Sequence, residues 1–314
     1  MIRKKPGFSF IMYRVREQIG CRDIVQAGGG KNITVAVLDT GVAKHPDLVD
    51  RVIGFRDFVN ERDEIYDDSG HGTHVCGIVC GSGLLSEGRY KGIAHKANLV
   101  VGKILDKKGD GAMESMLSAI EWIMQKKEEW DIRILNVSVG VGQLMNTEKE
   151  KVLKEKLESA WQKGLLVVCA AGNNGPAEES LSIVGQSPYL ITVGCHDGVY
   201  FTEKENRCAS YSARGSMFGT IRKPDIVAPG TEIISCNGSF KKNRGVYTNA
   251  YMAKSGTSMA TPIVSGALAL LLQKHPEYSN ETAKRKLLYS ASDLKEPWYQ
   301  QGWGMVNVAR MMEG

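Results

Sequence analysis

The sequence lacks the features that would place the chain in a membrane, secreted or zinc-binding class. Its longest apolar stretch, residues 265–272, is much shorter than the roughly 20 residues that span a bilayer. The first 14 residues are basic and only partly apolar, with neither the apolar core nor the small-residue cleavage site of a signal peptide. No two cysteines have the C-x-x-C spacing typical of zinc sites. We therefore expect a cytoplasmic protein without a membrane partner.

Disulfide bonds are also not expected, although the chain has seven cysteines. An odd number does not suit a disulfide framework, and several cysteines lie in apolar stretches, as Cys76, Cys80, Cys169 and Cys195 do. These positions indicate small buried residues in a reducing compartment.

The basic residues do not form a long run. The 40 Lys and Arg residues are scattered and leave a net charge of only +5 over 314 residues. The lysine pairs at 107–108, 126–127 and 241–242 are interpreted as solvated surface. Because nucleic-acid binding requires a clustered basic face, we expect no nucleic-acid partner.

The order of apolar segments indicates the fold class. Continuous apolar runs typical of buried parallel strands lie at 33–38, 98–104, 132–138, 165–170 and 190–193. Helix-period segments are expected at about 73–80, at 113–127 and 147–163, from near Ser258 to before Pro276, and at 280–289. No linker, low-complexity tract or internal repeat interrupts the pattern. It predicts a single α/β domain, with a mostly parallel sheet and helices on both faces.

Two segments carry residues suited to acid–base chemistry. Asp39 follows the first apolar run, and the carboxyl ends of parallel strands are where functional groups gather. It could orient a histidine, bind a metal or a ribose, or serve only in a turn. His71 and His74 lie three residues apart in a glycine-rich segment. For this pair a catalytic and a metal-binding role remain equally open.

Two later segments could serve a nucleophilic mechanism. Ser258 stands near the start of a long helix, where free backbone N–H groups can hold an anion. The alternative is an ordinary helix-capping serine. Asn173 follows a strand and could donate a hydrogen bond to an oxyanion, or could simply be a turn residue.

Together, these motifs resemble the subtilisin-like (S8, subtilase) family of serine proteases. The four main matches are Val37-Leu-Asp-Thr-Gly41, His71-Gly-Thr-His-Val75, Ala170-Ala-Gly-Asn173 and Gly256-Thr-Ser-Met-Ala-Thr-Pro262. Further matches are His45-Pro-Asp-Leu48, Asn136-Val-Ser-Val-Gly140, Pro224-Asp-Ile-Val-Ala-Pro-Gly230 and Gly302-Trp-Gly-Met-Val-Asn307. The order Asp, His, Ser is the one known from subtilisin. The resemblance runs from about residue 15 to the end.

The resemblance implies a serine endopeptidase that acts on unfolded proteins or peptides. Ser258 would be the nucleophile, His71 the general base, Asp39 the residue that orients it, and Asn173 an oxyanion donor. The same resemblance places Ser138, Val139 and Gly140 on one side of the primary pocket, and Gly109, Asp110 and Gly111 across the cleft. A polypeptide substrate would add to them as an extended strand.

Several finer points remain expectations. Met113 and Met116 could line a pocket or belong to the core, and Asp110 could favour basic substrates or only be solvated. No cofactor is expected for the chemistry. Structural calcium is an open question, since Asp47 matches one ligand position but the segment 81–91 lacks the expected asparagine ligand.

The amino-terminal segment departs from secreted members of the family. Before residue 15 there is no room for a signal peptide and a folding pro-domain, so residues 1–14 are interpreted as a short, inhibitory extension, as in intracellular members, and residues 15–314 as the peptidase domain. Two other functions on the same fold remain open: a catalytically silent binding protein and an acyl transferase. The oligomeric state cannot be derived from the sequence.

Overall fold

The fold is built on one large parallel sheet, as the apolar runs predict. The computed structural model describes residues 12–21, 28–138, 147–197 and 208–313. Seven strands lie in the order β2-β3-β1-β4-β5-β6-β7, and each neighbouring pair is parallel. Their bounds are β1 Thr34–Asp39, β2 Val52–Asp57, β3 Asn98–Lys103, β4 Ile132–Val137, β5 Leu166–Ala170, β6 Ile191–His196 and β7 Ile226–Pro229.

The two strands that the sequence did not reveal are those at the edges of this sheet. The central strands are buried on both faces, so they appear as unbroken apolar runs. Strand β2 is only partly buried and contains Gly54 and Arg56, while β7 is four residues long and ends at Pro229. Strand β2 therefore lacks the apolar composition of a central strand, and β7 lacks its length.

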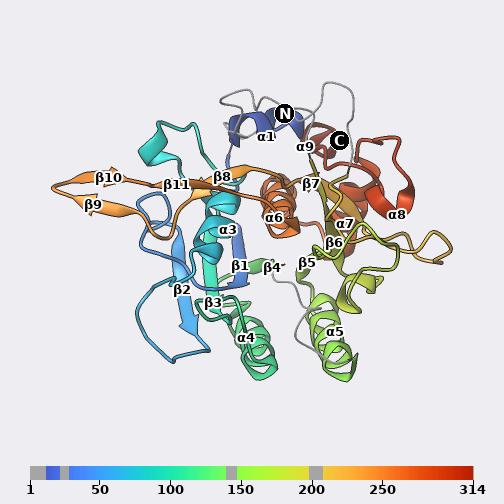
Figure 1. Cartoon of the computed structure of the whole chain (residues 1–314), viewed down its shortest axis with the longest axis horizontal. Helices are drawn as coiled ribbons and strands as arrows, with labels where there is room; N and C mark the ends of the chain where they lie inside the picture. Colours follow the sequence, from blue (N-terminus) through green and yellow to red (C-terminus); the bar gives the residue numbers. More distant parts are fainter. Residues whose placement is uncertain (1–11, 22–27, 139–146, 198–207, 314) are drawn as a thin grey trace, which may run out of the picture.

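Helices cover both faces of the sheet, with α3 and α6 on one face and α4 and α5 on the other (Figure 1). Their bounds are α1 Met12–Gln18, α3 His71–Cys80, α4 Met113–Lys126, α5 Thr147–Gln162, α6 Thr257–Lys274, α7 Asn280–Tyr289, α8 Trp298–Gln301 and α9 Val308–Met312. Short 3₁₀ turns lie at Leu84–Ser86 and Val184–Gln186. None of the described helices has the length and apolarity needed to cross a membrane.

Helix α6 lies at the centre of the molecule. Fifteen of its residues are buried, on every side of the helix, which is the pattern of a fully enclosed helix. Helix α4 shows the narrower stripe that the sequence predicts. Its Met113 and Met116 are buried in the main core, which decides between core and pocket in favour of the core.

Helix α1 connects the amino-terminal segment to the domain. Met12 and Val15 are fully buried in the main core. The expected boundary between residues 14 and 15 therefore falls inside a helix, and residues 1–11 lie outside the described residues.

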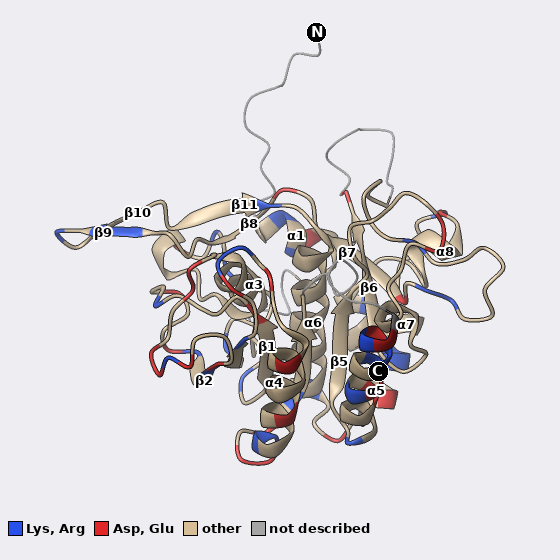
Figure 2. Cartoon of the chain, turned by 60° about the horizontal axis from the view of Figure 1, so that its bottom comes forward, with Lys and Arg blue, Asp and Glu red and all other residues tan. Residues whose placement is uncertain are grey.

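Two small antiparallel sheets form an arm that projects from the body. Strand β8 (Ile233–Cys236) pairs with β11 (Tyr251–Lys254), and β9 (Lys241–Asn243) pairs with β10 (Val246–Thr248) farther out. In Figure 2, α4 and α5 each carry both acidic and basic residues, whereas β9 carries only basic ones. The arm leads directly into the first residues of α6.

Candidate active site

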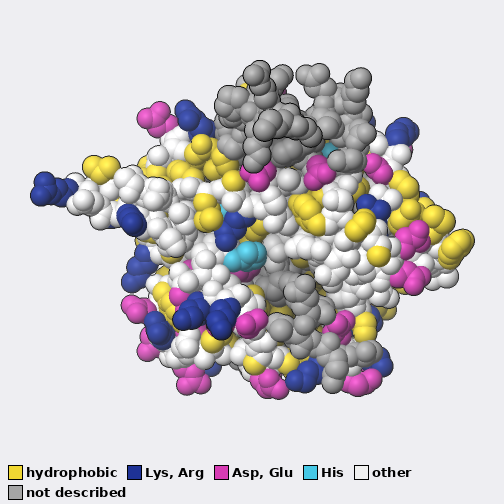
Figure 3. Space-filling view, in the orientation of Figure 1, with side chains coloured by type: hydrophobic (Ala, Val, Ile, Leu, Met, Phe, Trp, Pro, Cys, Tyr) yellow, Lys and Arg dark blue, Asp and Glu magenta, His cyan; other side chains and the backbone are white. Residues whose placement is uncertain are grey.

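The candidate active site begins where β1 ends and α3 starts. Asp39 is the last residue of β1 and is fully buried. His71 is the first residue of α3, and its side chain keeps 26% of its surface exposed. The Nδ1 atom of His71 lies 2.6 Å from Oδ1 of Asp39. In the space-filling view, a histidine reaches the surface near the middle of the face, beside basic side chains (Figure 3).

The Asp39 carboxylate determines the tautomer of His71. Because Asp39 can only accept, Nδ1–H must be the donor, which leaves the lone pair of His71 on Nε2. Oδ1 also accepts from the Thr40 N–H at 2.8 Å, and Oδ2 has no hydrogen-bond partner among the described residues. Burial disfavours the imidazolium, but the Asp39 charge and hydrogen bond outweigh it, so the pKa of His71 is raised. His71 is therefore a positioned base.

Helix α3 starts two residues earlier than the apolar pattern predicted, so His71 lies inside the helix and not before it. Two glycines make this possible. Gly70 caps the helix with a φ of 80°. A Cβ on Gly72 would lie 2.1 Å from the carbonyl oxygen of Gly41, so only glycine allows the helix to approach the end of β1 this closely.

A second carboxylate, Asp67, holds the two segments together. Its Oδ2 accepts from the N–H and the hydroxyl of Thr73, at 2.9 and 2.6 Å. Its Oδ1 accepts from the Thr40 hydroxyl at 2.9 Å, and that hydroxyl accepts from the Gly72 N–H at 2.9 Å. Burial would raise the pKa of Asp67, but these hydrogen bonds lower it overall. The sequence analysis missed Asp67, whose only signal is an acidic residue just before the first turn of the helix.

Ser258 is the second residue of α6 and is half-buried. The cap of the helix is Gly256, so the structure does not support the alternative that Ser258 is the capping residue. Its backbone N–H belongs to the first turn, where amides have no partner within the helix. The Ser258 hydroxyl makes no hydrogen bond to a described residue. Without substrate, the hydrogen bond between a nucleophile and its base is often long, and it shortens in the substrate complex. Helices α3 and α6 pack against each other.

Asn173 lies beside the start of α6. Its Oδ1 accepts from the N–H and hydroxyl of Thr257, at 3.0 and 3.1 Å, which leaves the Nδ2 group available as a donor. A Cβ built on Gly256 would lie 3.4 Å from that Nδ2 and 3.8 Å from the backbone nitrogen of Ser258. Both candidate oxyanion donors thus lie within 3.8 Å of one point beside Gly256.

The segments expected to bind substrate lie at the carboxyl edge of the sheet. Ser138 follows β4, is buried, and receives a hydrogen bond from Asn136 at 2.7 Å, while Val139 and Gly140 lie outside the described residues. Across β1, Gly109, Asp110 and Gly111 follow β3. There the Asp106 carboxylate closes a turn by accepting from the Asp110 N–H at 3.0 Å, and Asp110 itself is exposed.

The metal-binding alternative for His71 and His74 is not supported. The His74 ring is buried, and its Nε2 donates towards the carbonyl oxygens of Ile233 and Met252, at 3.0 and 3.1 Å. Burial lowers the pKa of His74 to about 3, so the ring is neutral. Its role is to attach the arm to α3.

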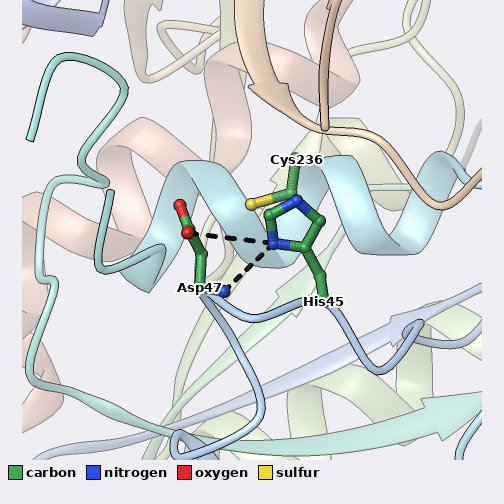
Figure 4. A group of neighbouring side chains, drawn as sticks. All are labelled: His45, Asp47 and Cys236. Atoms are coloured by element: carbon green, nitrogen blue, oxygen red, sulfur yellow. Dashed lines mark hydrogen bonds and ion pairs between the residues drawn. The ribbon is translucent and has the colours of Figure 1, made fainter. Parts of the chain in front are cut away.

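A separate buried cluster surrounds Asp47 (Figure 4). One ligand-type atom each from His45, Asp47 and Cys236 lies within 4.8 Å of the others. Nitrogen and sulfur are not calcium ligands, since calcium takes six to eight oxygens. Both nitrogens of His45 already have partners, with Nε2 2.9 Å from the Ala250 carbonyl and Nδ1 accepting from the Asp47 N–H at 3.1 Å.

The oxygens of Asp47 are also occupied by hydrogen-bond donors. Oδ1 accepts from the Leu85 N–H at 3.1 Å, and Oδ2 accepts from the Gly83 N–H at 3.0 Å and the Tyr251 hydroxyl at 2.8 Å. A cation needs lone pairs and would face these positive hydrogens instead. The residues around Asp47 therefore do not fit a calcium ion.

One further residue near the site was missed by the sequence analysis. Lys103, the last residue of β3, is fully buried. Its ammonium group donates to the Thr40 carbonyl at 2.8 Å, the Leu105 carbonyl at 2.7 Å and Asp68 at 2.8 Å. It joins the residue after Asp39 to the loop before α3 and to the loop after β3. A lysine at the end of an apolar run gave no signal of this role.

Comparisons with known proteins agree with this geometry. Residues 30–304 match the family model described as the subtilase family, Peptidase_S8. Serine protease AprX of Bacillus subtilis (strain 168) is 40% identical over 301 residues, covering 91% of this chain and 67% of the relative. Subtilisin DY of Bacillus licheniformis is 33% identical over 291 residues, covering 91% and 93%.

Solved structures show the same likeness. Sphericase superimposes with a TM-score of 0.77 at 30% identity, covering 89% of this chain and 92% of that one. S41 Psychrophilic Protease gives 0.75 at 29% identity, with the same coverage. The parallel sheet, the Asp39–His71 pair and the match over most of the chain lead to one conclusion. The chain belongs to the subtilase family and is a subtilisin-like serine endopeptidase.

Proposed function

We propose that Ser258 is the nucleophile of this peptidase and that Asp39 and His71 activate it. The observation that carries the proposal is the 2.6 Å contact of His71 Nδ1 with the buried Asp39. It places the ring proton on Nδ1 and leaves Nε2 as the basic atom. His71 takes the proton of the Ser258 hydroxyl as this oxygen attacks the substrate carbonyl, and then gives the proton to the leaving amine. Water hydrolyses the acyl-enzyme by the same steps.

The oxyanion is held by the Nδ2 group of Asn173 and the backbone N–H of Ser258. Support comes from their shared position beside Gly256 and from the two hydrogen bonds of Thr257, which turn the amide so that Nδ2 is the free end. Donors fixed before the reaction stabilise the developing charge without reorganisation.

The substrate is an extended polypeptide that pairs with the segments after β3 and β4. Ser138 and residues 109–111 follow β4 and β3, on the two sides of β1, and an extended strand between these segments would lead its acyl side to Ser258. Every group named in this mechanism is a side chain or a backbone amide. The chemistry therefore uses no cofactor, and the donor set around Asp47 argues against calcium there.

Serine labelling and hydrolysis test this function together. Wild type should react with a fluorophosphonate probe at Ser258 and cleave unfolded casein, and Ser258→Ala should do neither. Absence of an adduct on folded wild type would favour a silent binding protein. Products whose mass shows an added amine instead of water would favour an acyl transferase.

We also propose that the protein works in the cytoplasm. All seven cysteines are free and buried, which suits a reducing compartment. Burial raises the pKa of Cys21 to about 12, so that this thiol stays neutral and unreactive.

Residues 1–14 are proposed as an inhibitory extension that precedes a peptidase domain at 15–314. The burial of Met12 gives this segment a fixed attachment to the domain.

A further inference from the structure

The outer strands of the arm formed by β8–β11 carry exposed positive charge and no acidic residue. Lys241, Lys242 and Arg244 lie in or between its outer strands and are exposed. In the sequence, no Asp or Glu occurs between Glu232 and Glu277. The sequence predicts solvated surface for the lysine pair at 241–242, and the structure adds that the pair lies on a projecting antiparallel hairpin without acidic residues.

Elsewhere on the described surface, lysines commonly have acidic partners. Such pairs are Lys126–Glu129, Lys127–Glu128, Lys151–Glu148, Lys154–Glu158, Lys156–Glu121 and Lys295–Asp293. On the arm, Lys242 packs over the Tyr247 ring at 5.3 Å and has no acidic partner among the described residues. The charged groups of Lys241 and Arg244 likewise contact no described acidic residue. These charges are therefore available to an acidic partner from outside the described chain.

The arm is continuous with the catalytic centre through Lys254. This residue ends β11 opposite Ile233, is half-buried, and precedes Ser258 by four positions. The hydrogen bonds of His74 hold β8 and β11 on α3, one helical turn after His71. The positive charge of Lys254 is close enough to lower the pKa of both histidines.

The position of the arm decides which part of a substrate would meet it. The segments proposed to bind the acyl side lie at the carboxyl edge of the main sheet, after β3 and β4. The arm belongs to a different sheet, which packs on α3 through His74 and Ser235. Since the acyl half of a substrate would occupy the edge of the main sheet, the arm and Lys254 would be left for the leaving-group half.

We propose that Lys254 and the basic arm select polypeptides with acidic residues on the leaving-group side of the cleaved bond. The inference rests on the proposed function, since it assigns a specificity to the same site. Lys254 contacts the first residues after the cleaved bond, and Lys241, Lys242 and Arg244 attract acidic residues farther along. The outer edges of β9 and β10 also leave backbone groups for strand pairing.

Quenched fluorescent peptides test the selection. Three peptides share one acyl half and carry Glu-Glu, Gln-Gln or Lys-Lys directly after the cleaved bond. For wild type we expect kcat/KM to be about five times higher for Glu-Glu than for Gln-Gln at low salt, since one exposed charge pair gives about a two- to fivefold effect. The ratio should approach one in high salt. Because both kcat/KM values in a ratio come from the same variant, a change in the pKa of His71 affects them equally and cancels.

Two variants and a control locate the effect. Lys254→Glu should invert the ratio of kcat/KM for Glu-Glu to kcat/KM for Gln-Gln. The triple variant Lys241→Glu, Lys242→Glu and Arg244→Glu should reduce the same ratio when the peptides are extended by four further acidic residues. Lys31→Glu changes an exposed lysine just before β1, at the opposite edge of the sheet, and should keep the wild-type ratio.

The outcomes separate this inference from the function itself. Equal rates on all three wild-type peptides would overturn the selection but leave the peptidase intact, whereas no cleavage and no fluorophosphonate adduct would overturn the function. If the arm variants changed only binding to phosphatidylserine vesicles or single-stranded DNA, and not the ratio, the arm would serve another partner and the inference would be wrong.

Discussion

The side-chain oxygen of Asn173 accepts two hydrogen bonds from a single residue, Thr257, at 3.0 Å from its N–H and 3.1 Å from its hydroxyl. The same hydroxyl accepts from the Gly172 N–H at 3.2 Å. Thr257 precedes Ser258, so the residue next to the nucleophile also orients the proposed oxyanion donor.

Removing the Thr257 hydroxyl should therefore reduce turnover without removing the donor. We expect Thr257→Val to lower kcat about tenfold, and Thr257→Ser to stay close to wild type. Removing a side-chain donor of this kind in a subtilisin lowers turnover by about 10²–10³, which sets the scale for Asn173→Ala. Steady-state kinetics of the double variant provide the check: if Thr257 acts through Asn173, adding Thr257→Val to Asn173→Ala should have little further effect.

The pH dependence of kcat/KM should report the environment of His71. Its pKa is raised, and the base must be neutral to act, so the acidic limb should lie above the ordinary histidine value of 6.5. Because the positive charge of Lys254 opposes protonation, Lys254→Gln should move this limb to still higher pH. A pH–rate profile on a neutral peptide measures both. An acidic limb that moves to lower pH in Lys254→Gln would contradict its assignment to His71.

Asp67 should contribute to stability as well as to positioning. In Asp67→Asn one accepting oxygen becomes an NH2 group, which in either orientation faces a backbone N–H, that of Thr73 or that of Gly70, so we expect a loss of about 1–3 kcal/mol in the free energy of unfolding at neutral pH. The lowered pKa of Asp67 means that its contribution is present above pH 3.8 and lost as the pH falls further. Urea unfolding should show this, with the exposed Asp63→Asn as a neutral control.

Calcium should not change the contribution of Asp47. Asp47→Asn disturbs the bonds from Gly83, Leu85 and Tyr251, and should cost about 1–3 kcal/mol. Thermal melts of wild type and variant, each with excess calcium or excess chelator, distinguish a hydrogen-bonding role of Asp47 from a calcium-binding role. We expect the same difference in melting temperature under both conditions. A difference that appears only with calcium would mean that Asp47 is a ligand after all.

Deletion of residues 1–11 tests the proposed inhibition. The deletion stops before Met12 because that side chain is fully buried, and removing it would also damage the core. We expect the shortened chain to cleave peptides faster, and a synthetic peptide of residues 1–11 to slow it again. Unchanged kcat/KM with an unchanged melting temperature would show that this segment does not inhibit.

Much of the fold could be predicted because its signals are local. Strands β1 and β3–β6 are buried on both faces, so burial alone required continuous apolar runs. The start of α3 could not be predicted in the same way. It depends on Gly72 fitting against Gly41, and on Asp67 reaching Thr73, neither of which changes the apolar pattern.

The sequence by itself determined the family and singled out Asp39, His71, Asn173 and Ser258 as candidate site residues, because the motifs around them are short and local in the chain. The tertiary structure decided what each atom does. Hydrogen bonds between distant segments give His71 its tautomer, and give Asn173 its orientation. Both hydrogen bonds require the donor and acceptor to lie within a few tenths of an ångström of the ideal distance, and only the packing of β1, α3 and α6 places them there.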